Sequence, residues 1–412
     1  MVEPIKINEG FKNTDAGVIP NDWNAPVLSE ISNFENGKAH EQFIDDKGDY
    51  IVVNSKFISQ EGRVAKFSKE NLSPLAKGDI AIVMSDIPNG KALAKCFFID
   101  KDNRYTLNQR IGCIKPNADM DNDYLFYKLN RNKYFLAFDS GSGQTNLKKS
   151  EILACPLALP PTKDEQTAIA TAIKNAGELI KQLAKQLIKK RNMKIGAMQE
   201  LLKPKEGWLI RHIPEFINKN DGIKIGPFGS ALKKELLVSS GYKVYGQENV
   251  FEKDMSIGCR YINKEHFTKL KTCELNSGDF IISMMGTIGK CMIVPEKFEP
   301  GIMDSHLIRL RLNNDLVDAN YLLHYFTSDA LLCQVNTFSV GGIMAGLSST
   351  IIKQISVPFP PLIEEQTKIA KILSDMNSEI EELQMKLKKT QMMQQGMMQS
   401  LLTGKIRLTK TD

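Results

Sequence analysis

A repeat with a spacing of 200 residues organises this 412-residue chain. The pattern Pro-Pro…Glu-Gln-Thr…Ile-Ala occurs at residues 160–170 and again at 360–370. A Met-Gln…Leu-Leu pattern follows at 198–202 and again at 398–402. So many matches in one register are not expected by chance. The chain therefore consists of two related halves, and each half holds one more variable block and one helical segment.

Each repeated pattern opens a segment with the spacing of a long helix. Apolar residues recur at intervals of four and three, which is typical of a coiled-coil seam. Thr162 and Glu165 predict a capping box at the first helix, with Glu165 reaching back, while Pro204 and Gly404 predict the helix ends. Two matched helices most simply pack against each other as an antiparallel pair. The expected seam residues are Ile169, Ile173, Ile180, Leu183, Leu187, Ile369, Leu373, Ile380, Leu383 and Leu387.

The blocks between these helices combine strands with short helices. In both blocks a Gly-Asp pair, at 78–79 and 278–279, precedes an apolar run that predicts a strand. The expected fold class is α+β, with two mixed α/β domains separated by two long antiparallel coiled-coil helices in a pseudo-two-fold internal repeat. The expected boundaries are a first domain at 1–160, a helical spacer at 161–205, a second domain at 206–360, and a helical spacer with its tail at 361–412.

The positive charge of the chain lies outside the two blocks. Residues 1–163 carry 21 basic and 21 acidic residues, and residues 206–363 carry 16 of each. The net charge of +6 therefore comes from the two helical segments. A nucleic-acid surface on either block must arise from the arrangement of its side chains, because neither block is basic overall.

Sequence motifs of the common enzyme classes are missing. The chain contains no phosphate-binding G-x-x-x-x-G-K-[ST] loop, no H-E-x-x-H zinc motif, and no Asn-Pro-Pro or Asp-Pro-Pro motif of an amino-methyltransferase. Its seven cysteines form no C-x-x-C pair, so we expect reduced thiols and no metal site. Asp79 and Asp279 are explained by Gly-Asp turns better than by a nuclease site.

The blocks are instead rich in loops with hydrogen-bonding side chains. Asn, Gln, Arg and Ser are the residues that contact base edges and phosphates in DNA complexes. Each loop alone fits an ordinary turn, but similar loops at similar places in both blocks favour a binding surface. The candidate DNA-binding residues are Lys38, His40, Asn54, Lys56, Lys91, Asn108, Gln109, Arg110, Ser142, Gln144 and Asn146 in the first block, and Phe228, Ser230, Lys233, Gln247, Asn249, Thr287, Lys290, Ser305 and His306 in the second.

These features together resemble a known protein family. Ile-Pro-Asn-Asp-Trp at 19–23, Pro-Phe-Gly-Ser at 227–230, the Gly-Asp strands and the two Pro-Pro…Glu-Gln-Thr helices resemble the specificity subunit of type I restriction-modification systems. The first block departs from the second, because it has Gly-Lys-Ala-His at 37–40 where the second has Gly-Pro-Phe-Gly-Ser at 226–230.

The resemblance implies a division of labour. Each block is then a target recognition domain that reads one half of a bipartite, asymmetric site in double-stranded DNA. The helices fix the gap between the halves and bind two modification subunits, which hold S-adenosylmethionine and methylate adenine. Restriction subunits add ATP-driven cleavage, and this chain is non-catalytic, with no cofactor of its own. The tail from Gly404 to Leu408 resembles the family's usual ending and is expected to pack onto the first domain.

Two other readings stay open at this stage. In the first, the chain is an active enzyme, a recognition part that has kept its own methyltransferase or nuclease. In the second, it is a non-catalytic two-domain coiled-coil scaffold that bridges proteins without reading DNA. The absence of an N-terminal apolar stretch and of any run of about 20 apolar residues predicts a cytoplasmic protein.

Overall fold

The computed structural model describes residues 9–87, 91–139, 141, 143–285, 289–338 and 347–408. It divides into two compact units. The first unit comprises Met1–Leu183 and Lys386–Asp412, and the second comprises Ala184–Met385. The expected mixture of strands, short helices and two long helices is confirmed, and each long helix contributes residues to both units.

The first unit is built on two sheets. A four-stranded antiparallel sheet has the order β3 (Ser32–Asn36), β10 (Ile111–Pro116), β6 (Ile80–Val83) and β8 (Cys96–Phe98). A three-stranded sheet has the order β5 (Phe67–Ser68), β4 (Tyr50–Val53) and β9 (Tyr105–Leu107), in which β4 and β9 are parallel. The remaining strands form two pairs, β1 (Phe11–Thr14) with β2 (Gly17–Pro20), and β7 (Ser85–Asp86) with β11 (Thr145–Asn146). The short helices are α1 (Leu28–Ile31), η1 (Glu41–Phe43), α2 (Ser55–Ser59), α3 (Asn122–Leu129), α4 (Lys133–Leu136) and α5 (Lys149–Leu153).

The second unit repeats this topology. Its four-stranded sheet has the order β13 (Ile223–Ile225), β19 (Leu307–Leu310), β16 (Phe280–Ser283) and β17 (Cys291–Ile293). Its three-stranded sheet has the order β15 (Tyr261–Ile262), β14 (Tyr242–Tyr245) and β18 (Gly301–Met303), with β14 and β18 parallel. A further pair joins β12 (Leu209–His212) to β20 (Ser356–Phe359). The short helices are η2 (Ile213–Glu215), η3 (Gly229–Leu232), η4 (Lys234–Leu236), α7 (Gln247–Glu252), α8 (Lys264–Lys269), η5 (Lys271–Cys273), α9 (Ala319–Phe326), α10 (Asp329–Phe338) and α11 (Ser349–Gln354).

The two long helices are matched in length. The helix α6 (Lys163–Leu201) and the helix α12 (Ile363–Leu401) have 39 residues each, or about 58 Å at 1.5 Å per residue. In the first unit Ile169 shares a core with Leu401, and the Gln394 side chain donates to the Ile173 carbonyl at 3.3 Å. The segments of α6 and α12 that belong to this unit are therefore antiparallel, as expected.

The second unit contains the complementary segments of the same helices. Lys190 of α6 forms an ion pair with Glu379 of α12, and Leu202, just after α6, shares a core with Leu373. Here too the segments are antiparallel. Most seam positions are buried in their own unit, while Ile180, Leu383 and Leu387 are half-buried.

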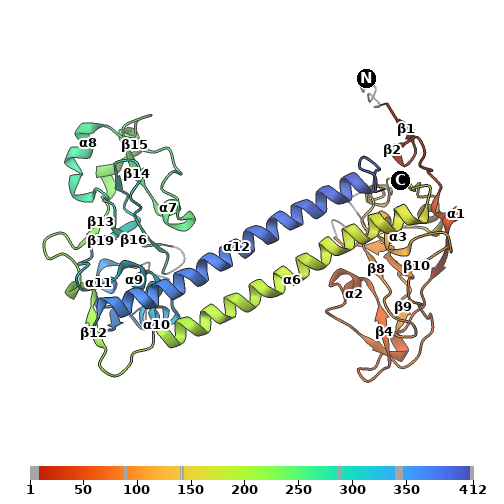
Figure 1. Ribbon diagram of the computed structural model, residues 1–412, viewed down its shortest axis with the longest axis horizontal. Coiled ribbons are helices and arrows are strands. Elements are labelled where there is room, and N and C mark those ends of the chain that lie inside the picture. The colour runs from red at the N-terminus through yellow and green to blue at the C-terminus, as the bar shows by residue number, and fades with distance from the viewer. Residues whose placement is uncertain are drawn as a thin grey trace. The chain divides into compact units, whose positions relative to one another are not determined.

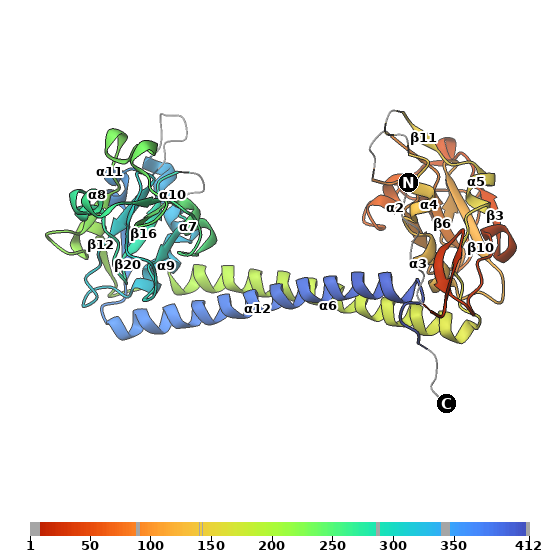
Figure 2. The ribbon, with the colours of Figure 1, turned by 90° about the horizontal axis from the view of Figure 1, so that it is seen from above.

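A short helix links sheet and long helices in each unit. The helices α3 and α9 lie between the four-stranded sheet and the long helices of their own unit (Figures 1 and 2). Tyr124 of α3 is fully buried and donates its hydroxyl to the Ala158 carbonyl at 2.9 Å. Tyr321 of α9 does the same to the Pro358 carbonyl at 2.6 Å. The equivalent tyrosines show that the two units share their packing as well as their topology.

The repeated Glu-Gln-Thr motif attaches each long helix to this short helix. The Gln166 side chain accepts from the backbone N–H of Asp121 at 3.0 Å, and Thr167 donates to the Asp121 carboxylate at 2.8 Å. In the second unit Gln366 and Thr367 bind Asp318 at 3.0 and 2.9 Å. Because Asp121 and Asp318 are the N-caps of α3 and α9, the motif fixes the start of one helix against the start of another.

The capping box expected at Thr162 forms only in part. The Thr162 hydroxyl accepts from the Glu165 N–H at 3.3 Å. Glu165 does not reach back, because its buried carboxylate binds Arg407 of the tail. Arg407 also pairs with Asp22, and Leu408 packs against the first core. The expectation that the tail packs onto the first domain is confirmed.

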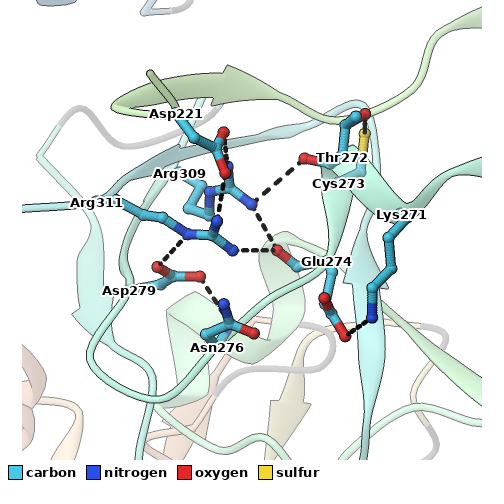
Figure 3. A network of polar contacts seen from close by, with 9 residues as sticks. All are labelled: Asp221, Lys271, Thr272, Cys273, Glu274, Asn276, Asp279, Arg309 and Arg311. Atoms are coloured by element: carbon cyan, nitrogen blue, oxygen red, sulfur yellow. Dashed lines mark hydrogen bonds and ion pairs between the residues drawn. The ribbon is translucent and has the colours of Figure 1, made fainter. Parts of the chain in front are cut away.

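An arginine pair joins the two sheets of the second unit (Figure 3). Arg309 of β19 is fully buried, and both it and Arg311 pair with Asp221. Arg309 also donates to the carbonyl of Glu274 at 2.6 Å, and Arg311 donates to the Asp279 carboxylate at 3.1 Å. Since Glu274 follows η5 and pairs with Ile302 of the three-stranded sheet, these arginines hold one sheet against the other.

Candidate nucleic-acid interface

In each unit, three loops meet at the same edge of the two sheets. We call this region the loop edge. In the first unit it comprises Gly37–His40 after β3, Asn54–Lys56 after β4, and Asn108–Arg110 between β9 and β10. In the second unit it comprises Gly226–Phe228, Gly246–Glu248 and Asp304–His306, at the corresponding places. The loop edge gathers seven of the eleven candidate residues of the first block and four of the nine of the second.

Backbone hydrogen bonds show that the loops of the two units are equivalent. Gly37 N donates to Ile111 O at 3.1 Å, and Gly226 N donates to Leu307 O at 3.2 Å. Asn108 N donates to Val53 O at 3.1 Å, and Asp304 N donates to Tyr245 O at 2.8 Å. The departure noted in the sequence, Gly-Lys-Ala-His against Gly-Pro-Phe-Gly-Ser, therefore lies at one structural position.

A glycine is required at this position in both units. A Cβ atom on Gly37 would lie 2.1 Å from the Asn108 carbonyl oxygen, and one on Gly226 would lie 1.8 Å from the Asp304 carbonyl oxygen. Real Cβ atoms do not approach a backbone oxygen so closely. The glycines allow two loops of the edge to touch, so that the neighbouring residues 38 and 227 begin the same exposed turn.

Most of the first unit's candidates lie on this surface. Lys38, Lys56, Gln109 and Arg110 are exposed at the loop edge. Asn54 is half-buried, and its side chain caps α2 by accepting from the Phe57 N–H at 2.9 Å. Asn108, also half-buried, accepts from the Gln109 N–H at 2.6 Å.

His40 has a different place from its neighbours. Its side chain is 1% exposed, and its ring nitrogens lie 2.7 Å from the Lys38 carbonyl and 2.7 Å from the Thr106 hydroxyl. Both nitrogens are occupied within the unit, so His40 supports the loop and does not face outward in this structure.

The remaining candidates of the first unit lie on the loop after β7 and at or before its partner strand β11. Gln144 and Asn146 are exposed, and Gln144 donates to the Ser85 hydroxyl at 2.7 Å. Lys91 is exposed on the neighbouring loop, which Asp86 shapes by accepting from the Ala92 N–H at 2.6 Å. Ser142 lies outside the described residues.

The second unit presents a more apolar and more acidic edge. Phe228 is 61% exposed, His306 is exposed, and Gln247 and Ser305 are half-buried. Lys233 and Lys290 are exposed on other loops of the unit. Asn249 is 1% exposed and is used inside α7, where it accepts from Gly246 N at 3.0 Å. Thr287 and the side chain of Ser230 lie outside what the structure describes.

Sequence reasoning missed one charged cluster at this edge. Arg260, which precedes β15, donates through Nη2 to Glu248 Oε1 at 2.9 Å and to Asp304 Oδ2 at 3.0 Å. Burial opposes the charge of Arg260, but Asp304 and Glu248 outweigh it and raise the pKa of the guanidinium. No motif marks this cluster in the sequence, because its three residues come from three separate segments of the chain.

The two Gly-Asp aspartates are structural, as expected. Asp79 and Asp279 accept from the backbone N–H of Ala76 at 2.9 Å and of Asn276 at 2.7 Å. Burial raises the pKa of both carboxyls. They close the turns that start β6 and β16 and lie at the end of these strands away from the loop edge.

Other kinds of site are not found in the part of the chain that the structure describes. No group of three or more potential metal ligands occurs among the described residues. None of the described helices combines the length and apolar character that a membrane crossing requires. All seven cysteines are free thiols, and five are buried, while Cys259 and Cys333 are exposed.

The chain is similar to a well-defined group of proteins. The family model of the type I restriction modification DNA specificity domain matches it twice, at residues 20–190 and 215–389. A protein of Methanocaldococcus jannaschii named as the type I restriction enzyme MjaX specificity subunit is 25% identical over 422 residues, covering 97% of each chain. The MjaIX specificity subunit of the same organism is 28% identical over 297 residues, covering 66% of this chain and 63% of that protein.

Solved structures share the fold. The S subunit of a type I restriction-modification system from M. genitalium aligns with a TM-score of 0.60 at 16% identity, covering 96% of this chain and 98% of that one. A second chain, from a structural study of the assembly and conformational transition of a type I system, aligns with a TM-score of 0.54 at 13% identity, covering 94% and 99%.

Proposed function

The chain belongs to the type I restriction modification DNA specificity family, and on that premise we propose that its two units read the two halves of one asymmetric DNA site. It is the specificity subunit of such a system and contains two target recognition domains. It is not itself the enzyme, because catalysis in these systems lies in the partner subunits.

The observation that carries the proposal is the pair of equivalent loop edges. The two units share strand order, register and glycine contacts, yet the side chains at equivalent edge positions differ in charge and size. A shared scaffold with different exposed side chains suits two ligands of one class with different details. Two different DNA half-sites fit this description, since base edges are distinguished by hydrogen-bond pattern within one groove shape.

The charge distribution supports binding as part of a complex. Phosphate contacts supply most of the affinity of DNA-binding proteins, and neither block carries an excess of basic residues. We infer that two modification subunits, docked on the long helices, add phosphate contacts and carry S-adenosylmethionine. Restriction subunits complete the assembly, and the complex acts on double-stranded DNA in the cytoplasm.

The test is a comparison of methylomes. Cells that express the modification subunit with this chain are sequenced for methylated adenine, beside cells that express the modification subunit alone. A new motif with two defined halves and a fixed gap is the expected result. If the complex is shown to be assembled but no new motif appears, the proposal is contradicted. A protein scaffold is then the remaining interpretation. Methyl transfer by this chain alone would instead contradict its non-catalytic role.

A further inference from the structure

Three positions of the loop edge carry opposite chemistry in the two units. The strand registers align Glu248 with Lys56, Asp304 with Asn108, and Arg260 with Lys66. The last pair is fixed by matching hydrogen bonds, because Val52 N donates to Lys66 O and Val244 N donates to Arg260 O, both at 2.8 Å. The first unit therefore places two positive charges and one amide where the second places one positive and two negative charges.

The three residues of the second unit form one cluster. Asp304 is 7% exposed at its side chain and holds Arg260 at 3.0 Å, while the more exposed Glu248 holds it at 2.9 Å. Gly246 leaves room for this arrangement, since a Cβ there would lie 2.4 Å from Arg260 Nη2. Both carboxylates therefore hold the same nitrogen of Arg260.

These two hydrogen bonds leave the other donors of Arg260 available. Its side chain is 34% exposed, and within the described residues its only hydrogen-bond acceptors are those two carboxylates, both at Nη2. Nη1 and Nε are therefore open to an acceptor from outside. His306 lies on the other side of Asp304, whose Oδ1 accepts from the His306 N–H at 2.9 Å.

We propose that Arg260 is a guanine-reading residue of the second unit, with Asp304 and Glu248 as its positioning residues. This inference rests on the proposed function and names one base of the half-site that the second unit reads. Guanine offers two acceptors, O6 and N7, on its major-groove edge, and arginine is their commonest partner. Because both Nη2 protons are bound by Glu248 and Asp304, Arg260 donates to guanine as a single contact from Nη1 or Nε. A flexible arginine would lose side-chain entropy on binding, whereas one already fixed by two carboxylates loses less.

The acidic partners also argue against a simple phosphate contact. Two carboxylates next to Arg260 give the cluster a net negative charge, which repels the DNA backbone. Glutamate at a base edge instead accepts from cytosine N4, so Glu248 suits the partner strand of the same G·C pair. In the first unit Asn108 and Lys56 stand at the positions of these two carboxylates, and we expect a different base preference there.

The experiment uses the assembled complex and the methylome readout. The wild-type motif is expected to contain a G·C pair in the half that the second unit reads. The variant Arg260→Ala should relax that one position, so that methylation at sites with the other three bases rises relative to guanine by about 10- to 100-fold. Arg260→Lys should keep a weaker guanine preference, because lysine also contacts O6 and N7.

The matched control is Lys66→Ala, at the equivalent position of the first unit. It should leave the relaxed position of the Arg260→Ala motif unchanged and affect only the other half.

A uniform loss of methylation with the motif intact would show a phosphate or structural role for Arg260 and overturn the inference. So would an unchanged motif in both variants, or a half-site without a G·C pair. If Arg260→Ala does not fold, an Arg260→Lys motif with undiminished guanine preference overturns it alone. Absence of any wild-type motif contradicts the proposed function itself, and the inference falls with it.

Discussion

Arg407 donates to both carboxylate oxygens of Glu165, through Nε at 2.6 Å and Nη2 at 2.9 Å, although 242 residues separate them in the chain. The Glu165 side chain is 2% exposed. Its charge is therefore compensated by a residue from the C-terminal tail. The same guanidinium binds Asp22 at 2.8 and 2.9 Å and lies 5.7 Å from the Trp23 ring. The tail thus closes the first unit by joining its N-terminal segment to the start of α6.

Arg407→Ala is expected to lower the free energy of unfolding of the first unit by about 2 kcal/mol, because it leaves a buried carboxylate without its partner. Urea denaturation of the full chain, with limited proteolysis of the tail, measures this effect. Lys405→Ala is the matched control, since Lys405 is exposed on the same tail. Equal stabilities of the two variants would contradict the role given to Arg407.

The two copies of the glutamine are expected to differ in importance. Gln366 accepts from Asp318 N and also donates to the Leu316 and Pro360 carbonyls at 3.3 and 3.2 Å. Gln166 makes only the first of these bonds within the described residues. Gln366→Ala should therefore destabilise its unit by about 2 to 3 kcal/mol, and Gln166→Ala by about 1 kcal/mol. Hydrogen exchange of the α9 and α3 amides reports each unit separately, and a larger effect at Gln166 would contradict the argument.

The repeat made much of the fold predictable. Identical spacing of the two Glu-Gln-Thr motifs predicted two matched helices, and both end three residues before the stop signals at Pro204 and Gly404. The physical reason is that periodic apolar residues and local stop signals act over short stretches of chain. The Gly-Asp turns and the strands that follow them were predictable for the same reason.

Contacts between distant residues were not predictable in this way. Thr162 and Glu165 fit a capping box locally, but Arg407 outcompetes the local partner of Glu165, and its approach depends on the folded tail. The Arg260 cluster escaped notice because loops of unequal length break the 200-residue register, so Glu248 and Lys56 do not align in the sequence. His40 and Asn249 have the residue types of a binding surface, yet the fold uses His40 to support a loop and Asn249 inside α7.

A buried histidine makes the second unit sensitive to acid. His324 of α9 is 2% exposed and bonds to the Ser374 hydroxyl at 2.9 Å. Burial, assisted by Lys194 and Lys253, lowers the pKa of His324 to about 4, although a hydrogen bond with the Ala370 backbone and, more weakly, Asp318 oppose this shift. The unfolded chain, with a pKa of about 6.5, binds a proton first as the pH falls, so stability decreases from about pH 7 towards pH 4.

This titration should lower the free energy of unfolding by about 1 kcal/mol between about pH 7.5 and pH 5.5. Chemical denaturation at several pH values measures it. His324→Gln keeps a hydrogen-bonding side chain without a titration in this range, so its stability should depend less on pH. A variant with the wild-type pH profile would show that His324 is not the group responsible.

The glycine contact of the loop edge gives a prediction with an internal control. Gly226→Ala places a Cβ 1.8 Å from the Asp304 carbonyl oxygen, and we expect a loss of about 2 kcal/mol in stability and weaker methylation at sites of the wild-type motif. Gly196→Ala in α6 meets no atom within 4 Å and should raise stability by up to about 1 kcal/mol. Thermal unfolding and the methylome measure the two effects, and a harmless Gly226→Ala would contradict the close approach.

The length of the helices is expected to set the gap between the two half-sites. Up to Leu183, α6 belongs to the first unit and from Ala184 to the second, while α12 passes between the units in the reverse direction at Met385. Deletion of residues 181–187 together with 382–388 removes one heptad from each helix and keeps both seams in phase. Each helix shortens by about 10 Å at 1.5 Å per residue, which corresponds to about three base pairs of DNA. The loop edges are untouched, so the methylome of the variant should show the same two half-sequences with a shorter gap.

Deletion of the heptad from α6 alone is the control, because it destroys the match between the helices and should abolish methylation. An unchanged gap in the double deletion would show that the helices do not measure the site.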